Sequence, residues 1–379
     1  MVHAKGKDFR VYYLLYVLLE MIPSLFTGAD MRSSYYADDV TLLLKDITGM
    51  VEPIATEERE RYIQNGIHYS AMLPLEYKPT AKYIDAYNMA LKRFGQQTAD
   101  AIERVSEKIY EKMGEDGVIV SLARAGTPIG ILIHRYIKNK HQLDMKHYSI
   151  SIIRGRGIDH NALEYIIEKH GANNIQFVDG WVGKGAIFNE LRKALSDYPY
   201  VPTEFAVVAD PANITDMCGT HDDIIIASSC LNSTVSGLIS RTFLREDIIG
   251  PKDYHGAAYY GELRNEDRTY EFIEYIESLF RYNLGSTIEP GKFHGMDEVI
   301  RIADDYGVDD INHIKPGIGE TTRVLLRRVP WKVLISKDYL NSDELSHIYQ
   351  VAKERLVEII PYDLKNYKCC GIIKKLADI

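Results

Sequence analysis

Short apolar runs alternate with amphipathic stretches through the middle of the chain. The apolar runs predict strands at 118–122, 147–153, 174–179, 205–209 and 223–227. Between them, apolar positions that recur every three or four residues predict helices at 128–138, 160–170, 185–196 and 232–243. Strands that alternate with helices in this way are typical of an α/β fold, in which helices cover both faces of a parallel sheet.

The segments on either side of this region carry different patterns. We expect residues 31–116 to be mostly helical, with Asp38 and Asp39 capping the apolar stretch 40–44. Further helices are predicted at 57–64, 81–113 and 268–282. Pro290-Gly291 is interpreted as a linker, after which an α/β pattern returns. The predicted units are an N-terminal extension at 1–30, an α/β domain with a helical N-terminal part at 31–288, and a small α/β domain at 292–379.

The N-terminal extension holds an apolar stretch, Phe9–Phe26, that is rich in Leu, Tyr and Val. Arg10, Glu20 and Pro23 interrupt this stretch, whereas a transmembrane helix needs about 20 mostly apolar residues. Since no small-residue cleavage site follows, we do not expect a signal peptide. We expect a packed or interface helix without stable membrane insertion. The alternatives are a helix on a membrane surface and a dispensable extension.

Composition narrows the class of protein. The 379 residues are 46% hydrophobic and 26% charged, which is typical of a soluble globular protein. A formal net charge of −9 argues against a protein that coats nucleic acid nonspecifically, although it allows a local basic patch. The four cysteines form no CxxC pair, so no metal site is predicted, and they are expected to be thiols of a cytoplasmic protein.

Two of the predicted strands end in glycine-bearing turns that lead into helices. The first turn is Arg124-Ala125-Gly126-Thr127-Pro128 and the second is Asp179-Gly180-Trp181-Val182-Gly183-Lys184-Gly185. Backbone N–H groups at such turns and at helix N-termini bind phosphate, and ligands of parallel sheets bind beyond the carboxyl ends of the strands. The second turn is not a Walker A motif, because the hydroxyl residue required after the lysine is replaced by Gly185. The two turns predict a site for a ligand with two phosphate clusters. The alternative is a plain strand–helix turn with a surface lysine.

The order and spacing of these turns resemble the phosphoribosyltransferases, whose substrate is phosphoribosyl pyrophosphate (PRPP). The resemblance implies that the first turn binds pyrophosphate through Arg124, Ala125, Gly126 and Thr127. It implies that Asp179 binds the ribose hydroxyls and that the second turn binds the 5′-phosphate through Gly180, Trp181, Val182, Gly183, Lys184 and Gly185. Mg²⁺ is the implied cofactor, and oligomers are compatible with the resemblance.

A glycine-flanked loop lies between the two turns, where this family keeps a flexible lid. The resemblance implies that Arg154 and Arg156 on this loop close over the pyrophosphate; the alternative is an ordinary solvated loop. The implied catalytic set is therefore Arg124, Arg154, Arg156 and Asp179. Two positions depart from the family pattern, since Gly180 stands in place of a second acid and Val182 in place of a threonine.

Within this group the chain is most similar to the phosphoribosyltransferase-like proteins of bacterial tellurite-resistance and stress operons, some of which are labelled StiP and called cysteine proteases. The segments that carry this resemblance are 32–40, 68–70, 73–77, 122–130, 177–181 and 230–238. The resemblance implies transfer of a phosphoribosyl group to an unidentified acceptor in a stress response.

Cys230 supports a rival hypothesis. A thiol at a helix N-terminus is activated as a nucleophile, and Asn232 or Ser233 is a suitable cap for a helix there. His221 precedes the cysteine by nine residues, which allows contact between the two. A cysteine hydrolase is therefore one alternative. The others are a substrate-pocket role for Cys230, Asn232 and Ser233, and a small buried residue at a strand–helix junction.

The C-terminal domain carries a second resemblance. Residues 315–328, followed by a predicted strand at 331–335, resemble the turn and helix of Pelota-type and kink-turn RNA-binding domains, with Gly319 in place of the base-contacting Asn. The resemblance implies contacts to structured RNA through Gly317, Glu320, Thr322, Arg323 and Arg327. The alternative is an amphipathic helix with a solvated basic face. A nucleotide-sensing or RNA-binding adaptor without turnover is thus a further hypothesis for the whole chain.

Overall fold

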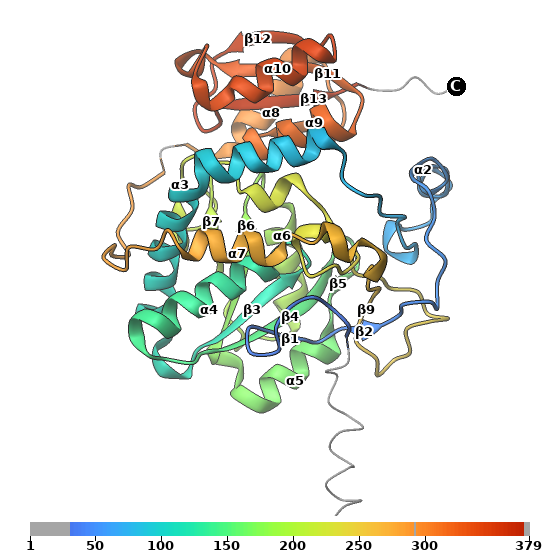
Figure 1. Cartoon of the computed structure of the whole chain (residues 1–379), viewed down its shortest axis with the longest axis vertical. Helices are drawn as coiled ribbons and strands as arrows, with labels where there is room; N and C mark the ends of the chain where they lie inside the picture. Colours follow the sequence, from blue (N-terminus) through green and yellow to red (C-terminus); the bar gives the residue numbers. More distant parts are fainter. Residues whose placement is uncertain (1–30, 292, 375–379) are drawn as a thin grey trace, which may run out of the picture.

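The computed structural model describes residues 31–291 and 293–374, so the helix predicted within residues 1–30 lies outside the described part of the chain. A seven-stranded sheet forms the centre of the larger domain (Figure 1). Its strands are β1 (Thr41–Leu42), β3 (Val118–Ala123), β4 (Lys146–Ile153), β5 (Gly157–Ile158), β6 (Ile175–Trp181), β7 (Phe205–Ala209) and β8 (Cys218–Thr220). They follow the order β1-β4-β3-β6-β7-β8 with parallel pairing, and β5 pairs antiparallel with β4.

Helices cover both faces of this sheet, as the strand–helix alternation predicts. The helices of this domain are α2 (Thr56–Gln64), α3 (Ala81–Met113), α4 (Thr127–His141), α5 (His160–His170), α6 (Ala186–Ala194) and α7 (Thr269–Glu277). Alternate strand residues point to opposite faces. Ile119 accordingly packs in one core with α3, α4 and α7, whereas Val118 and Val120 pack in another with α5 and α6. The α/β class with a parallel sheet is confirmed.

The helical N-terminal part is only partly as predicted. α2 and α3 form where they are expected, but residues 40–46 form two short strands, β1 and β2 (Lys45–Asp46), and β2 pairs with β9 (Gly256–Ala257). Asp39 does not cap a helix. Its carboxylate instead accepts two bonds of 2.8 Å from Arg135 and one of 2.7 Å from the Tyr270 hydroxyl. The predicted helix at 40–44 is therefore wrong, because this acid is used in a tertiary ion pair.

Two further predictions, the strand at 223–227 and the helix at 232–243, are also wrong. The sheet ends instead with β8, which pairs with β7. The second segment contains only a short 3₁₀ turn, Ser233–Val235. Gly237 follows at φ 71°, where an added Cβ would lie 2.2 Å from the Tyr35 ring. Residues 240 and 243 then bond to the backbone of residues 258 and 256, so this segment folds as an irregular strap.

The C-terminal domain is a small α/β unit that packs on α3 (Figure 1). Its elements are α8 (Gly295–Tyr306), β10 (Ile314–Pro316), α9 (Ile318–Arg327), β11 (Pro330–Ser336), α10 (Ser346–Glu354), β12 (Glu358–Tyr362) and β13 (Cys369–Ile373), with the sheet order β10-β13-β11-β12. The Tyr83 hydroxyl of α3 donates to the Leu326 carbonyl at 3.2 Å, and Lys82 pairs with Glu354 at 2.7 Å. The two domains therefore share a packed interface.

The contact between β8 and α3 yields a stability prediction. A Cβ on Gly219 would lie 1.9 Å from the backbone carbonyl oxygen of Ala101, and backbone atoms cannot move aside as a flexible side chain can. We expect Gly219→Ala to lower the free energy of unfolding by about 3 kcal/mol, at the upper end of ordinary overpacking. Urea denaturation measures this loss. Gly285→Ala is the control, because no atom lies within 4 Å of its added Cβ; equal stabilities of the two variants would contradict the prediction.

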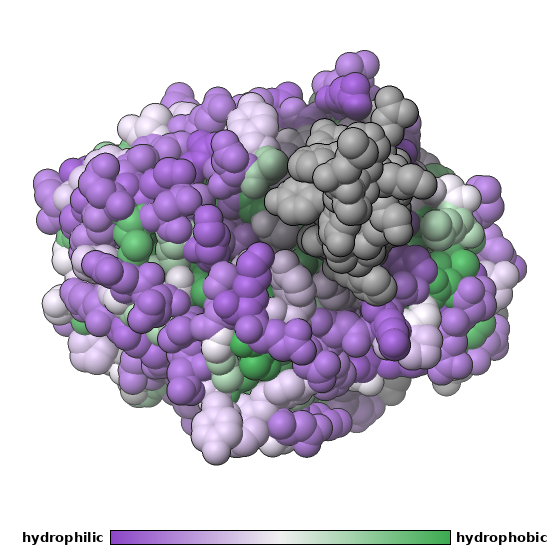
Figure 2. Space-filling model, turned by 90° about the horizontal axis from the view of Figure 1, so that it is seen from below, coloured by the Kyte–Doolittle hydropathy of each residue, from purple (hydrophilic) through white to green (hydrophobic). Residues whose placement is uncertain are grey.

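The surface shows no unusual polarity where it is visible. Hydrophilic side chains dominate the face seen in Figure 2, and hydrophobic ones are scattered between them. This pattern is ordinary for a protein surface in water. Among residues 31–291 and 293–374, no helix combines the length and apolar character that crossing a membrane requires.

Candidate functional site

A cavity of about 250 Å³ lies beyond the carboxyl ends of β3 and β6, and we call it the sheet-end cavity. Its polar lining comes from four parts of the chain: the turn after β3, strand β6, the segment 228–241, and helix α9 of the C-terminal domain. The charged and amide side chains that line it are Arg124, Asp179, Asn232, Arg241 and Arg323. The sheet-end cavity thus brings together residues of both domains.

Arg124 is held rigidly at the wall of the sheet-end cavity. It follows β3 through a cis peptide bond, and its side chain is largely buried. Its Nη1 atom donates to the Glu76 carboxylate and to the Ile239 carbonyl, both at 3.1 Å. These contacts fix the position of the guanidinium, which is where the sequence analysis expects a pyrophosphate ligand.

Arg241 is the centre of a cluster of positive charge. Its side chain forms no ion pair and no hydrogen bond with residues 31–291 or 293–374. Its side chain is exposed to solvent, but the surrounding protein atoms, together with the charges of Arg124, Arg323 and Arg59, lower its pKa to about 9. Glu76 is the carboxylate that opposes them. Several guanidinium groups that converge on one acid create a strong local preference for an anion.

A second cavity of about 630 Å³ adjoins the first and shares Leu231, Asn232 and Arg241 with it. Arg59, Arg328 and Arg355 line this adjoining cavity. The positive region is therefore larger than the sheet-end cavity alone, with room for a second ligand beside the first.

Asp179 lies on β6 and lines the same sheet-end cavity as the arginines. Its Oδ1 atom accepts the amide of Gly180 at 2.7 Å. Burial nevertheless raises the pKa of Asp179 to about 7. Such a shift is common at functional sites because burial there tunes a group toward neutral pH. Trp181 lies beside it in the cavity wall.

The second glycine turn is only partly arranged as expected. The amides of Gly183, Lys184 and Gly185 donate to no other group in the described part of the chain, although Gly185 is buried and none of the three residues lines the sheet-end cavity. The Lys184 ammonium, however, donates to the carbonyl of Ile311 and, at 3.1 Å, to that of Ile314. Its expected role in binding a phosphate is not what the structure shows, because the side chain joins the two domains. Gly180 and Val182 are buried in the same turn.

The first glycine turn also divides into exposed and buried parts. Ala125 lines the sheet-end cavity. A Cβ on Gly126 would lie 2.8 Å from the Leu122 carbonyl oxygen, so this glycine permits close packing. Thr127 is fully buried, and its hydroxyl lies 2.7 Å from that of Ser149. The side chain of Thr127 thus supports the core instead of lining the cavity as expected.

The predicted lid is a tight turn. Arg154 and Arg156 lie in the hairpin between β4 and β5, and Glu190 of α6 accepts the amides of Gly155 and Gly157 at 2.8 and 3.0 Å. The Arg154 guanidinium donates to Asn312 of the C-terminal domain at 3.0 Å. Neither arginine lines the sheet-end cavity in this arrangement, so closure of Arg154 and Arg156 over a ligand stays a prediction.

Cys230 is not at a helix N-terminus. It ends a 3₁₀ turn, Ala227–Cys230, and is buried in the wall of the adjoining cavity. His221 instead contacts Cys218, with 3.6 Å between Nε2 and Sγ. Burial raises the pKa of Cys218 to about 12. Ser233 is buried, whereas Asn232 lines both cavities.

The predicted RNA-contacting turn faces the larger domain. The Ile318 amide donates to Asp223 at 3.0 Å, and Gly317 packs against the same carboxylate. Thr322 is buried, where its hydroxyl donates to the Ile318 carbonyl at 2.8 Å. Glu320 pairs with Arg323 at 2.8 Å, and the side chain of Arg327 lies outside the described residues. In this arrangement the turn is covered, so RNA could reach it only if the domains separated.

Several residues of the site escaped the sequence analysis. Arg241 and Arg59 lay inside predicted helices, and Glu76 lay in the segment 73–77, which carries the family resemblance but was given no role in a site. The signal that existed was Gly237, whose left-handed backbone ends any helix through this segment. These arginines come from segments far apart in the sequence, so no local sequence pattern predicts that they lie together.

Comparisons with known proteins agree with both resemblances. A family model described as "Tellurite-like stress resistance cysteine protease StiP" matches residues 33–277, and the PELOTA RNA binding domain matches residues 293–375. The chain is 35% identical over 365 residues to the "Cysteine protease StiP" of Acinetobacter baylyi, covering 91% of this chain and 94% of the relative.

Solved structures give a weaker likeness. Two structures of a hypoxanthine-guanine phosphoribosyltransferase from Bacillus anthracis match 31% of this chain and 68% of theirs. The TM-scores are 0.24 and 0.23, at 17% and 16% sequence identity.

Proposed function

The chain belongs to the StiP family of tellurite-like stress resistance proteins, and from this premise we propose that it is a phosphoribosyltransferase-type enzyme. It binds PRPP in the sheet-end cavity and transfers the phosphoribosyl group to an acceptor that is not identified. The observation that carries the proposal is the convergence of Arg124, Arg241 and Arg323 on the cavity that Asp179 lines from another side.

The charges of the sheet-end cavity suit the two ends of such a ligand. The guanidinium groups of Arg124, Arg241 and Arg323 would bind the pyrophosphate, which gains negative charge as it leaves. Fixed donors that meet developing charge lower the barrier of a reaction more than donors that must reorient. Asp179 would accept hydrogen bonds from the ribose hydroxyls, and the amides of residues 183–185 would bind the 5′-phosphate.

The donor set fits a Mg²⁺ ion that arrives on its substrate. Asp179 is the acid that lines the sheet-end cavity, and Mg²⁺ is usually bound by one or two carboxylates plus substrate phosphates. When bound, the ion would neutralise part of the pyrophosphate charge. The chain itself would contribute the arginines that orient this leaving group and the walls that exclude water.

The family name raises the alternative of a cysteine hydrolase. A nucleophilic cysteine must reach its substrate. Cys230 is 1% exposed and Cys218 is 0% exposed, so both thiols are shielded from a peptide. The geometry therefore favours the transferase over the hydrolase. Structured RNA is a second proposed partner, through the C-terminal domain that matches the PELOTA model.

The direct test of turnover is release of pyrophosphate from PRPP and Mg²⁺ in the presence of candidate acceptors: bases, nucleosides, carbohydrates and RNA. We expect release to depend on one acceptor class and to be lost in Asp179→Ala. Release that persists in this variant, or peptide hydrolysis that is lost in Cys230→Ala, would contradict the proposal.

The raised pKa of Asp179 predicts a pH dependence of binding. The ionised carboxylate accepts ribose hydroxyls better than the neutral acid, so affinity for PRPP should rise with pH through the pKa of about 7. The ionised fraction of Asp179 increases about tenfold between pH 6 and 8, so the affinity for PRPP should increase by up to about tenfold over this range. Calorimetric titration across this range measures it. Asp179→Asn should bind PRPP weakly, and its affinity should not rise across this pH range. An equal rise in this variant would mean that ionisation of the PRPP phosphates, and not of Asp179, causes the effect.

A further inference from the structure

Three side chains of different chemistry meet at the end of the large sheet opposite β1. Asp210 follows β7, Cys218 begins β8, and His221 follows β8. One potential ligand atom from each lies within 4.8 Å of the others. None of the three lines the sheet-end cavity. The sequence does not announce this cluster, because its members are three residue types at unequal spacing and include no CxxC pair.

The orientation of His221 is fixed by the backbone. Its Nδ1 atom lies 2.9 Å from the carbonyl oxygen of Asp210, and a carbonyl can only accept, so Nδ1 carries the proton. The lone pair is then on Nε2, and the Cys218 sulfur lies 3.6 Å from Nε2 and 3.8 Å from Nδ1. A histidine that ligates a metal commonly donates its other ring N–H to a carbonyl or carboxylate in this way.

The Asp210 carboxylate is fully buried and only half satisfied. Its Oδ2 atom accepts the amides of Ile214 and Thr215 at 2.6 and 2.8 Å. Its Oδ1 atom is buried and has no hydrogen-bond partner among the residues that the structure describes. A buried carboxylate oxygen without a donor is costly, so such an atom calls for an explanation. A bound cation would supply one.

We propose that Asp210, Cys218 and His221 bind a zinc ion. Thiolate, imidazole and carboxylate together are the donors that Zn²⁺ takes, whereas Mg²⁺ and Ca²⁺ take oxygen donors alone. Three protein ligands leave one position of a tetrahedral site for water or a further ligand.

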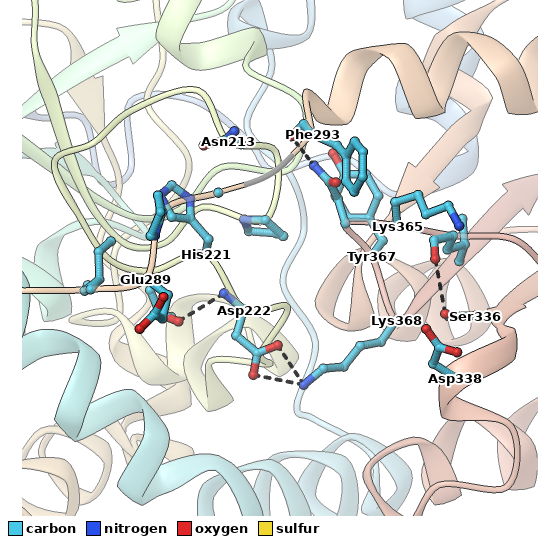
Figure 3. Close-up of a pocket in the computed structure, with 18 of the residues that line it drawn as sticks. Asn213, His221, Asp222, Glu289, Phe293, Ser336, Asp338, Lys365, Tyr367 and Lys368 are labelled. Atoms are coloured by element: carbon cyan, nitrogen blue, oxygen red, sulfur yellow. Dashed lines mark hydrogen bonds and ion pairs between the residues drawn. The ribbon is translucent and has the colours of Figure 1, made fainter.

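A route to this fourth position exists. A cavity of about 640 Å³ between the domains is lined by Gly219, Thr220 and His221. Figure 3 shows His221 and Asp222 on one side of it and Tyr367 and Lys368 of the C-terminal domain on the other, with the ion pair between Asp222 and Lys368 bridging the two sides. Among the three proposed ligands, His221 is the one that this cavity reaches, whereas Asp210 and Cys218 are buried behind it.

The test is metal binding by the full chain after removal of bound metal with a chelator. We expect one Zn²⁺ per chain by elemental analysis after dialysis, and a higher melting temperature with zinc than without it, because a ligand of the folded state stabilises that state. Co²⁺ as a probe should give the absorption of thiolate-to-metal charge transfer. Cys218→Ser and His221→Gln should each weaken zinc binding by about 100-fold or more and should remove this absorption or shift it.

Two controls keep the test decisive. Asp222→Asn and Cys230→Ser should bind zinc like the wild type, the first because it changes the residue next to His221 and the second because it removes a thiol outside the cluster. Zinc binding that survives loss of both Cys218 and His221 would overturn the proposal. A wild type that binds no zinc would also overturn the proposal. In that case, rapid alkylation of Cys218 that depends on His221 would identify Cys218 as a nucleophile and His221 as its base.

Discussion

Replacing Arg241 with alanine is expected to weaken PRPP binding by about 100-fold while leaving the fold intact. A hydrogen bond to a charged group contributes about 1.5–3 kcal/mol, and each 1.4 kcal/mol is a factor of ten in affinity. Arg241 forms no ion pair within the described residues and faces three other guanidinium groups. Its charge is therefore unbalanced in the free protein and should be balanced by an anionic ligand.

The same crowding predicts the effect on stability. Removing one of several like charges relieves repulsion, so the melting temperature of Arg241→Ala should equal or exceed that of the wild type. Arg264→Ala is the matched control, because Arg264 is exposed and lies outside both cavities. Calorimetric titration gives the affinities. If Arg241→Ala changes the affinity for PRPP by less than twofold, Arg241 is not part of the binding site.

Replacing Asp223 with alanine is expected to cost about 4 kcal/mol of stability and to release the C-terminal domain. The Asp223 carboxylate is buried and accepts the amides of Ile318 at 3.0 Å and Lys368 at 2.9 Å. Each buried amide that loses its acceptor costs about 1–3 kcal/mol. Since both amides belong to the C-terminal domain, the loss falls on the interface between the domains.

Urea denaturation and hydrogen exchange at the two amides measure this effect. Asp222→Ala is the control, because Asp222 is exposed and its one ion pair within the described residues is with the Lys368 ammonium at 3.1 Å, which keeps Glu344 as a second partner; loss of such an exposed partner costs about 0–1 kcal/mol. Protected amides of Ile318 and Lys368 in Asp223→Ala would contradict the prediction. Undocking should also uncover the turn at Gly317, so RNA that binds only to this variant would assign that turn to RNA.

The strands and helices of the central sheet were predictable because their signals are local. The run at 205–209 is continuously apolar and the run at 118–122 is interrupted only by Ser121, as is typical of strands covered on both faces. Ile224 to Ile226 carry the same signal and are also buried, but they pack beside α3 and α9 outside the sheet. Burial alone therefore does not distinguish a strand from a packed loop.

The candidate site was predictable in position and only partly in composition. The carboxyl ends of β3 and β6 follow from the fold class, and Arg124 and Asp179 follow from the turns that end those strands. The ammonium of Lys184 contacts two carbonyl groups of the C-terminal domain, which the turn sequence does not reveal, and its binding of a phosphate stays a prediction. Arg241 and Arg323 could not be predicted, since one comes from an irregular strap and the other from a different domain.

The measurement that tests the account most directly is calorimetric titration of the full chain with PRPP and Mg²⁺. The account predicts binding of one PRPP per chain with a dissociation constant on the order of micromolar, a typical value for a substrate, and loss of the heat in the Arg124→Ala, Arg241→Ala double variant. A wild type that is folded by circular dichroism and gives no heat would contradict the phosphoribosyltransferase proposal.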